Sequence, residues 1–190
     1  MSQPNYPDTE FKVLIEQNNV RTNPASYIPK LKKLLTYFRD NTLIIPGEEP
    51  VKTFEGVYAV EEAIEFLGKV NPLHEMKIDV NLSNACRDHV ADIGTRGLAT
   101  HEGSDGKGLV ERIEKYCEWD RTCAESIEFG YKNEENIVMN MIIDDGVKER
   151  HQRKNLFNSE FNFVGVGVGP HRDYGVVTVI NYAGGVYILR

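Results

Sequence analysis

Two runs of alternating residues near the C-terminus constrain the fold of this chain more than any other feature. The first run reads Phe161-Asn-Phe-Val-Gly-Val-Gly-Val, and the second reads Gly175-Val-Val-Thr-Val-Ile-Asn-Tyr-Ala. A period of two with many β-branched residues is typical of β-strands. The turn-rich segment Gly169-Pro-His-Arg-Asp-Tyr joins the two runs. The sequence therefore predicts an antiparallel hairpin at the centre of a small sheet.

Apolar residues recur at helical spacing in the segments before this hairpin. We expect helices over residues 24–38, 54–67, 82–93 and 133–143, a short helix over 109–116 and a strand over 124–129. Asn133 is placed to cap the helix that follows it, and Gly94 is placed to end the helix before it. Residues 1–20 are expected to be irregular, and residues 41–52 and 94–108 to be loops. Helices segregated against a short antiparallel sheet describe an α+β domain.

Charge and hydropathy argue against a nucleic-acid-binding surface and against a membrane-spanning helix. The 190 residues carry a formal net charge of −7, whereas a nucleic-acid surface needs clustered Lys and Arg. One local basic group is flanked by acidic residues, so we interpret it as solvated surface: Lys148, Arg150, Arg153 and Lys154. No apolar run reaches the roughly 18 residues of a membrane span. We therefore expect neither nucleic-acid binding nor a transmembrane helix.

The N-terminus and the cysteines bear on location. The opening residues Met1-Ser-Gln-Pro-Asn-Tyr-Pro-Asp lack the basic and apolar regions of a signal peptide. Three cysteines, an odd number, suit a reducing compartment. We expect an intracellular protein, cytoplasmic or cytoskeletal; an extracellular location would require that a signal peptide had been removed. Cys117 and Cys123 are close enough in sequence to form a disulfide under oxidising conditions. The simpler interpretation is that these two cysteines and Cys86 are all free thiols.

Four ordered blocks and the hairpin resemble one known family. The blocks are Leu82-Ser-Asn-Ala-Cys-Arg-Asp-His, Thr100-His-Glu-Gly-Ser-Asp-Gly, Ala124-Glu-Ser-Ile-Glu-Phe-Gly and Ile142-Ile-Asp-Asp-Gly-Val-Lys-Glu-Arg-His. Together they resemble the CAP superfamily of sperm-coating and pathogenesis-related-1 proteins, in its microbial and protist Asp-Asp-Gly-Val subtype. The resemblance implies a three-layer α-β-α sandwich with a small antiparallel sheet. It places the CAP domain at residues 51–190, with residues 1–50 as an N-terminal extension whose one helix packs on or beside the domain.

The resemblance also implies a polar cavity. The family's His-Glu-Glu-His set carries over to His101, Glu125, Asp144 and His151, with Asp144 one methylene shorter than the usual Glu. Two imidazoles and two carboxylates suit Zn²⁺. A polar pocket held by hydrogen bonds between His and carboxylate groups is the alternative. His89 falls on the inward side of its helix and is expected to be a core or pocket-edge residue.

The departures from the family's site guide the functional hypothesis. Asp144 replaces the second Glu, and Ala124 and Ser126 replace the Gly and Asn that flank the first. We therefore expect a non-enzymatic CAP module that binds a protein partner or forms part of an assembly. The alternatives are a secreted protein that binds a small lipid, a sterol or a metal, and a metal-dependent hydrolase with Glu125 as base. No HExxH or Gly-x-Ser-x-Gly signature supports the hydrolase.

Overall fold

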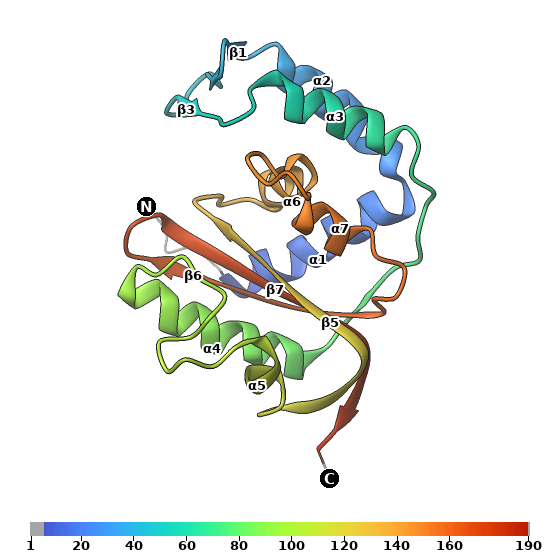
Figure 1. Ribbon diagram of the computed structural model, residues 1–190, viewed down its shortest axis with the longest axis vertical. Coiled ribbons are helices and arrows are strands. Elements are labelled where there is room, and N and C mark those ends of the chain that lie inside the picture. The colour runs from blue at the N-terminus through green and yellow to red at the C-terminus, as the bar shows by residue number, and fades with distance from the viewer. Residues whose placement is uncertain (1–5, 190) are drawn as a thin grey trace.

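The computed structural model describes residues 6–189, and its centre is a four-stranded sheet in the order β4-β6-β7-β5 (Figure 1). β6 (Phe163–His171) and β7 (Gly175–Ile188) form the antiparallel hairpin that the alternating runs predict. β5 (Cys117–Phe129) pairs antiparallel with β7, and the short β4 (Lys77–Ile78) pairs parallel with β6. The hairpin therefore lies at the centre of the sheet.

Helices cover both faces of this sheet (Figure 1). α4 (Val80–Arg96) and α5 (Leu109–Ile113) lie on one face. α1 (Tyr6–Thr22), α6 (Glu134–Ile143) and α7 (His151–Leu156) lie on the other. This arrangement confirms the predicted three-layer α-β-α sandwich.

Because both faces are covered, successive residues of β7 are buried in different cores. Val177 and Val179 pack with residues of α4, whereas Ile180 and Tyr182 pack with residues of α1 and α6. Asn133 caps α6 as predicted, since its side chain accepts a hydrogen bond from the backbone N–H of Asn136 at 2.8 Å.

Glycines let α4 approach the sheet and the hairpin closely. A Cβ at Gly165 of β6 would lie 2.3 Å from the backbone of Leu82, so no larger residue fits there. Gly94 has the same role, because a Cβ there would lie 2.2 Å from the carbonyl oxygen of Pro170. The expectation that Gly94 ends its helix is wrong: α4 continues to Arg96 and ends at Gly97, which has a φ of +70°.

Residues 1–20 were expected to be irregular, and this is wrong for residues 6–20, which belong to α1; residues 1–5 lie outside the described part of the chain. The sequence of α1 does not separate apolar from polar residues by face. Gln17 and Arg21 are fully buried, whereas Phe11 is 53% exposed. The Arg21 guanidinium donates to backbone carbonyls of four residues, which explains how a charged residue can be buried here. The acceptors belong to His74, Leu156, Asn158 and Phe161.

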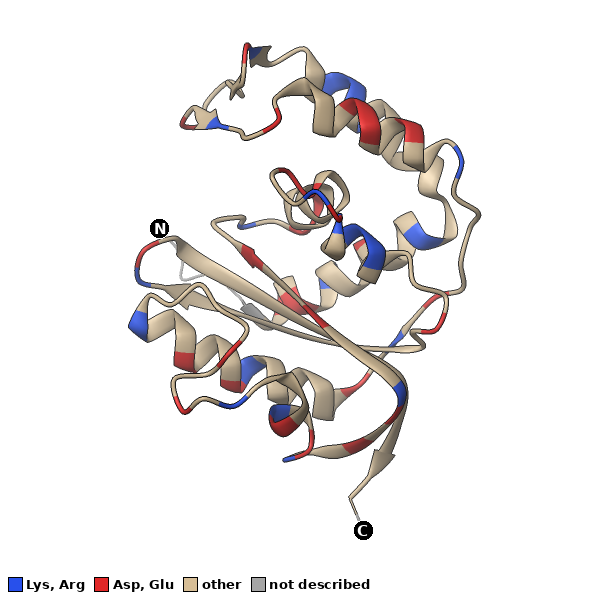
Figure 2. Ribbon diagram, viewed as in Figure 1, with Lys and Arg blue, Asp and Glu red and all other residues tan. Residues whose placement is uncertain are grey.

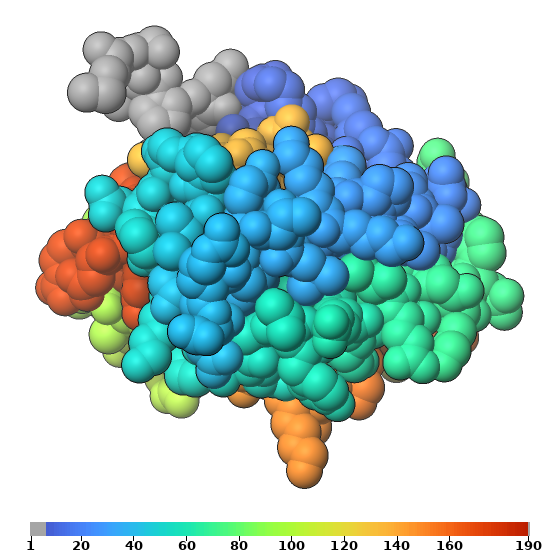
Figure 3. All heavy atoms as spheres, turned by 90° about the horizontal axis from the view of Figure 1, so that it is seen from above, coloured from blue at the N-terminus to red at the C-terminus, as the bar shows by residue number. Residues whose placement is uncertain are grey.

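An outer layer packs over α6 and α7 (Figure 3). It consists of a 3-10 turn (Pro24–Tyr27), α2 (Ile28–Leu35), the small antiparallel sheet of β1 (Phe38–Arg39), β2 (Thr42–Leu43) and β3 (Val51–Lys52), and α3 (Val57–Leu67). Residues 1–50 therefore carry two helices, α1 and α2, where one was expected. The boundary between residues 50 and 51 stays a prediction, and α2 packs on α3 across it.

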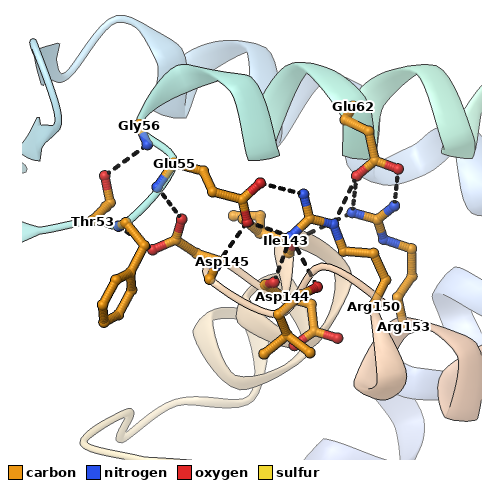
Figure 4. A network of polar contacts seen from close by, with 12 residues as sticks. Thr53, Glu55, Gly56, Glu62, Ile143, Asp144, Asp145, Arg150 and Arg153 are labelled. Carbon is orange, nitrogen blue, oxygen red and sulfur yellow. Dashed lines mark hydrogen bonds and ion pairs between the residues drawn. The ribbon is translucent and has the colours of Figure 1, made fainter.

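A network of ion pairs joins this outer layer to the rest of the molecule (Figure 4). Arg153 of α7 donates to both carboxylate oxygens of Glu62 on α3, each at 2.7 Å. Arg150 donates to Glu55 at 2.5 and 2.8 Å and to Glu62 at 3.1 Å. Figure 2 shows this complementarity as acidic positions on α3 opposite basic positions on α7. The charges interpreted from sequence as solvated surface thus include two arginines that are largely buried in ion pairs.

The cysteine geometry decides between the two alternatives left open above. Cys117 and Cys123 lie on the same strand, β5, which has a register shift between Asp120 and Cys123. Their partners on β7, Ile188 and Ala183, are five positions apart, so roughly 17 Å separates the two cysteines. A disulfide needs Cα atoms closer than about 7 Å, so these two cannot pair within one molecule. All three thiols are free. Within residues 6–189, no helix is both long and apolar enough to cross a bilayer.

Candidate functional site

Glu125 is the centre of the candidate site. It lies on β5, and only 3% of its side chain is exposed. One carboxylate oxygen lies 2.9 Å from Nδ1 of His101, and the other accepts a hydrogen bond from Arg112 of α5 at 2.7 Å. Burial of a carboxylate is costly unless it is paired, and the guanidinium supplies that pairing.

His101 reaches Glu125 from the loop after α4, and its side chain remains 67% exposed. Asp92 of α4 orders this loop by accepting hydrogen bonds from the backbone N–H and the hydroxyl of Ser104, at 2.7 and 2.6 Å. These donors and the Arg96 guanidinium lower the pKa of Asp92 to about 2. The Gly-Ser-Asp-Gly run therefore positions His101 through Asp92.

His89 completes the cluster from the inward side of α4. It is fully buried, its Nε2 lies 3.0 Å from the Thr100 carbonyl oxygen, and its ring approaches Glu125 to 4.0 Å. Since a carbonyl can only accept, Nε2 carries the proton and Nδ1 is left as an unpartnered acceptor. Burial lowers the pKa of this imidazole, so the neutral form is favoured. His89 was expected to be a core or pocket-edge residue, and it is a core residue, because its side chain is fully buried.

Asp144 and His151 lie elsewhere. Asp144 is the C-cap of α6 with a φ of 50°, and its Oδ2 accepts from the backbone N–H of Gln152 at 2.8 Å. His151 is the first residue of α7 and is exposed. The structure therefore brings His101 to Glu125, and Asp144 to the first turn of α7. Among residues 6–189, no hydrogen bond or ion pair links the side chains of His101 and Glu125 to those of Asp144 and His151.

The alternation of β5 explains the separation. Glu125 shares a face with Ile127, which packs with α4, whereas Glu128 points to the opposite face and accepts from Asn140 of α6 at 2.5 Å. Asp144 lies on the Glu128 side, where the two carboxyl groups act on each other electrostatically. β5 thus places one buried carboxyl group, that of Glu125, on the α4 face of the sheet and another, that of Glu128, on the α6 face.

These elements, in this order, were compared with known proteins. The model of the Cysteine-rich secretory protein family, CAP, matches residues 16–182. The chain belongs to the CAP family.

Three solved structures are similar to this chain at low sequence identity. An outer surface protein from Borrelia burgdorferi is 20% identical, with a TM-score of 0.50 over 65% of this chain and 86% of that one. An extracellular protein with an SCP domain from Bacillus anthracis is 16% identical, with a TM-score of 0.47 over 68% of this chain and 38% of that one. A cysteine-rich secretory protein from Staphylococcus aureus is 17% identical, with a TM-score of 0.43 over 73% of this chain and 42% of that one.

These likenesses concern the fold alone. No curated protein matches the chain. The Asp-Asp-Gly-Val subtype stays a prediction.

The zinc site that the CAP resemblance implies can be tested against the donors present. In the part of the chain that the structure describes, no group of three or more His, Cys, Asp and Glu residues is placed to hold a metal ion. Both oxygens of Glu125 are already engaged, one of them by the cationic Arg112. A guanidinium beside the carboxylate opposes a second cation there. As arranged, His101, Glu125, Asp144 and His151 do not fit a preformed Zn²⁺ centre.

Two buried charged residues were not predicted from the sequence: Arg112, which pairs with Glu125, and Glu128, on the opposite face of the sheet. Arg112 lies on a short helix, and nothing in its spacing points to Glu125, 13 positions later. Glu128 did leave a signal: it lies three positions after Glu125 in a predicted strand, and an odd spacing places two side chains on opposite faces. That alternation could have assigned Glu128 to the α6 face before the structure was known.

Proposed function

We propose that this chain is a non-enzymatic CAP module that acts by binding a protein partner. The observation that carries the proposal is the state of Glu125. A hydrolytic base needs a free oxygen within reach of water or substrate. Glu125 is instead buried and holds Arg112 and His101 in place, which is the chemistry of a structural ion pair.

The surface that favours binding lies at the start of α3, and we call it the Phe54–Tyr58 face. Phe54 is 82% exposed and Tyr58 is 62% exposed. They line an open groove of about 650 Å³ together with Glu55, Glu62, Gly146, Lys148 and Arg150. Exposed aromatic side chains beside a groove have the composition of interface hot spots.

The charges of the groove indicate what a partner would present. Arg150 is already paired with Glu55 and Glu62, whereas Lys148 forms no ion pair among the described residues. A protein segment with an apolar side chain next to a carboxylate would fill the groove and pair with Lys148. We propose a partner of that kind.

Co-purification with matched variants tests this proposal. The wild type and Ile188→Ser, an 85% exposed position on the far end of β7, should retain the same protein in fixed stoichiometry. Phe54→Ser/Tyr58→Ser should lose it, and Lys148→Glu should weaken it at low salt. If Phe54→Ser/Tyr58→Ser retained the partner as well as the wild type does, the Phe54–Tyr58 face would not be the binding surface.

Calorimetric titration with Zn²⁺ at near-neutral pH tests the non-enzymatic part. The wild type and the His101→Ala/His151→Ala variant should give the same small heat. Tight Zn²⁺ binding by the wild type that is lost in the double variant would contradict the interpretation of Glu125 as part of a structural ion pair. It would support a metal-based function instead.

A further inference from the structure

A second cavity lies between the outer layer and α6. It shares no lining residue with the groove of the Phe54–Tyr58 face, which it borders at Thr53, Gly56 and Asp145, and it does not include the Glu125 cluster. Its volume is about 120 Å³. Eight apolar residues line it: Leu34, Phe38, Leu43, Ile45, Val51, Val60, Met139 and Ile143. They come from α2, the small sheet, α3 and α6, so the cavity exists only because the outer layer covers α6.

Size limits what this cavity can hold. An engineered apolar cavity of about 150 Å³ in another protein stays dry and binds benzene. A volume of about 120 Å³ therefore suits roughly six non-hydrogen atoms, such as one ring or a six-carbon chain. A sterol or a long acyl chain is several times larger and does not fit.

Among the polar groups of the cavity, one side-chain amide is left to bind a ligand. Tyr131 donates to Asn140 at 3.0 Å, and Asn140 donates to Glu128, so these two are occupied. No hydrogen bond within residues 6–189 engages the side-chain amide of Asn136, which also lines the cavity. That amide offers a carbonyl oxygen that can accept from a ligand and an NH2 group that can donate to one, so the charge of the cavity decides the end group.

The charges that line the cavity are all negative. Glu48, Glu49 and Asp145 contribute to its wall, and no Lys or Arg does. Asp145 accepts from the backbone N–H groups of Phe54 and Glu55, while Glu48 and Glu49 are exposed. Burial, reinforced by the charges of Glu128, Asp145 and Glu48, raises the pKa of Tyr131 to about 12. A bound carboxylate would meet this negative potential without a counter-charge, whereas an ammonium would be attracted to it.

We propose that this cavity binds a small apolar amine, with its hydrocarbon part among Val60 and Met139 and its ammonium group toward Asn136 and the two exposed glutamates. The inference goes beyond the proposed function and does not depend on it. It rests on the volume, the apolar lining and the sign of the surrounding charge.

Methyl NMR with a matched series of probes tests the proposal. Hexylamine, hexanol and hexanoate share one chain and differ in charge. The amine should shift the methyl signal of Met139, which lines the cavity, and leave that of the buried Met141 unchanged. We expect hexylamine to bind at least about tenfold more tightly than hexanoate, with hexanol between them. Equal or tighter binding of hexanoate, or no shift with any probe at millimolar concentration, would overturn the proposal.

Variants separate the cavity from the general surface. Val60→Phe fills the cavity and should abolish the Met139 shift, whereas Val57→Phe, 39% exposed on the same helix, should preserve it. Glu48→Gln/Glu49→Gln lies on the surface and does not threaten folding. It should reduce the preference for the amine over hexanol while hexanol binding is retained. Unchanged amine preference in that variant would contradict the electrostatic part, even if Val60→Phe fails to fold.

Discussion

Glu128 shows at the residue scale what a buried carboxyl group does to this protein. It is 3% exposed, one oxygen accepts from Asn140, and the other has no partner among the described residues. Burial, with the nearby Asp144 adding to it, raises the pKa of Glu128 from 4.5 to about 8. The folded state therefore holds this proton where the unfolded state has lost it.

That difference predicts a pH dependence of stability. Between pH 4.5 and about 8 the folded state binds more protons at Glu128 than the unfolded state, so the free energy of unfolding falls as the pH rises through this window. Glu128→Gln keeps an acceptor for Asn140 and removes the titration. We expect the free energy of unfolding of this variant, relative to that of the wild type, to increase by on the order of a few kcal/mol between pH 5 and pH 8.

Urea denaturation at a series of pH values measures this gain. Glu118→Gln, an exposed position on the same strand, serves as the control and should follow the wild type at every pH. Parallel stability curves for Glu128→Gln and the wild type would show that Glu128 is ionised in the folded protein. Asp144, whose pKa burial also raises, contributes with the same sign and remains in both proteins.

At the scale of elements, the attachment of α3 to α7 combines apolar packing with ion pairs. Arg153 is 3% exposed and also donates to the carbonyls of Ile142 and Ile143, so it ties the end of α6 to Glu62. Its guanidinium lies 5.1 Å from the ring centroid of Phe66. Removing one partner of such a pair leaves the other desolvated.

Arg153→Met should therefore lower the free energy of unfolding by about 3 kcal/mol. The neighbouring Lys154→Met, at an exposed position, should change it by less than about 0.5 kcal/mol. Chemical denaturation of both variants measures the difference. Glu62→Leu/Arg153→Met should cost less than the two single changes added together, and additive costs would mean that the pair is not coupled.

At the scale of the whole molecule, α1 connects segments that are distant in the sequence. The Arg21 guanidinium binds carbonyls over sequence separations of 53 to 140 residues. The buried Gln17 accepts from Tyr182 of β7 at 2.7 Å, and Glu10 accepts from the backbone N–H of Val168 in β6 at 3.1 Å. A helix with these contacts belongs to the core of the sandwich.

We expect Arg21→Met to destabilise the protein by roughly 3 kcal/mol or more, because several buried carbonyls lose their donor at once. Lys12→Met, half-exposed on the same helix, is the control and should be nearly neutral. A chain that begins at residue 51 should fail to fold, as judged by its NMR dispersion. If that shorter chain folded cooperatively, residues 1–50 would be dispensable for the fold, and residues 51–190 would form the domain by themselves.

The elements whose pattern is local could be predicted from the amino-acid sequence. The hairpin, α3, α4 and α6 follow from hydrophobic periods of two or 3.6 residues, because each buries an apolar face. The family motifs added the sandwich and a set of four cavity residues, of which the structure brings His101 to Glu125. In contrast, α1 buries Gln17 and Arg21 and exposes Phe11, so no apolar period marks it.

The chemistry of the site depends on contacts between elements that are distant in the sequence. Arg112 reaches Glu125 because α5 packs beside β5, and a local sequence pattern does not encode that distance. The same is true of Asp144, which the fold joins to Gln152 and Glu128 rather than to Glu125. Local periodicity indicates which face of an element is apolar. The partner of a buried charge depends instead on how distant elements pack, and in this fold the packing of α5 beside β5 pairs Glu125 with Arg112.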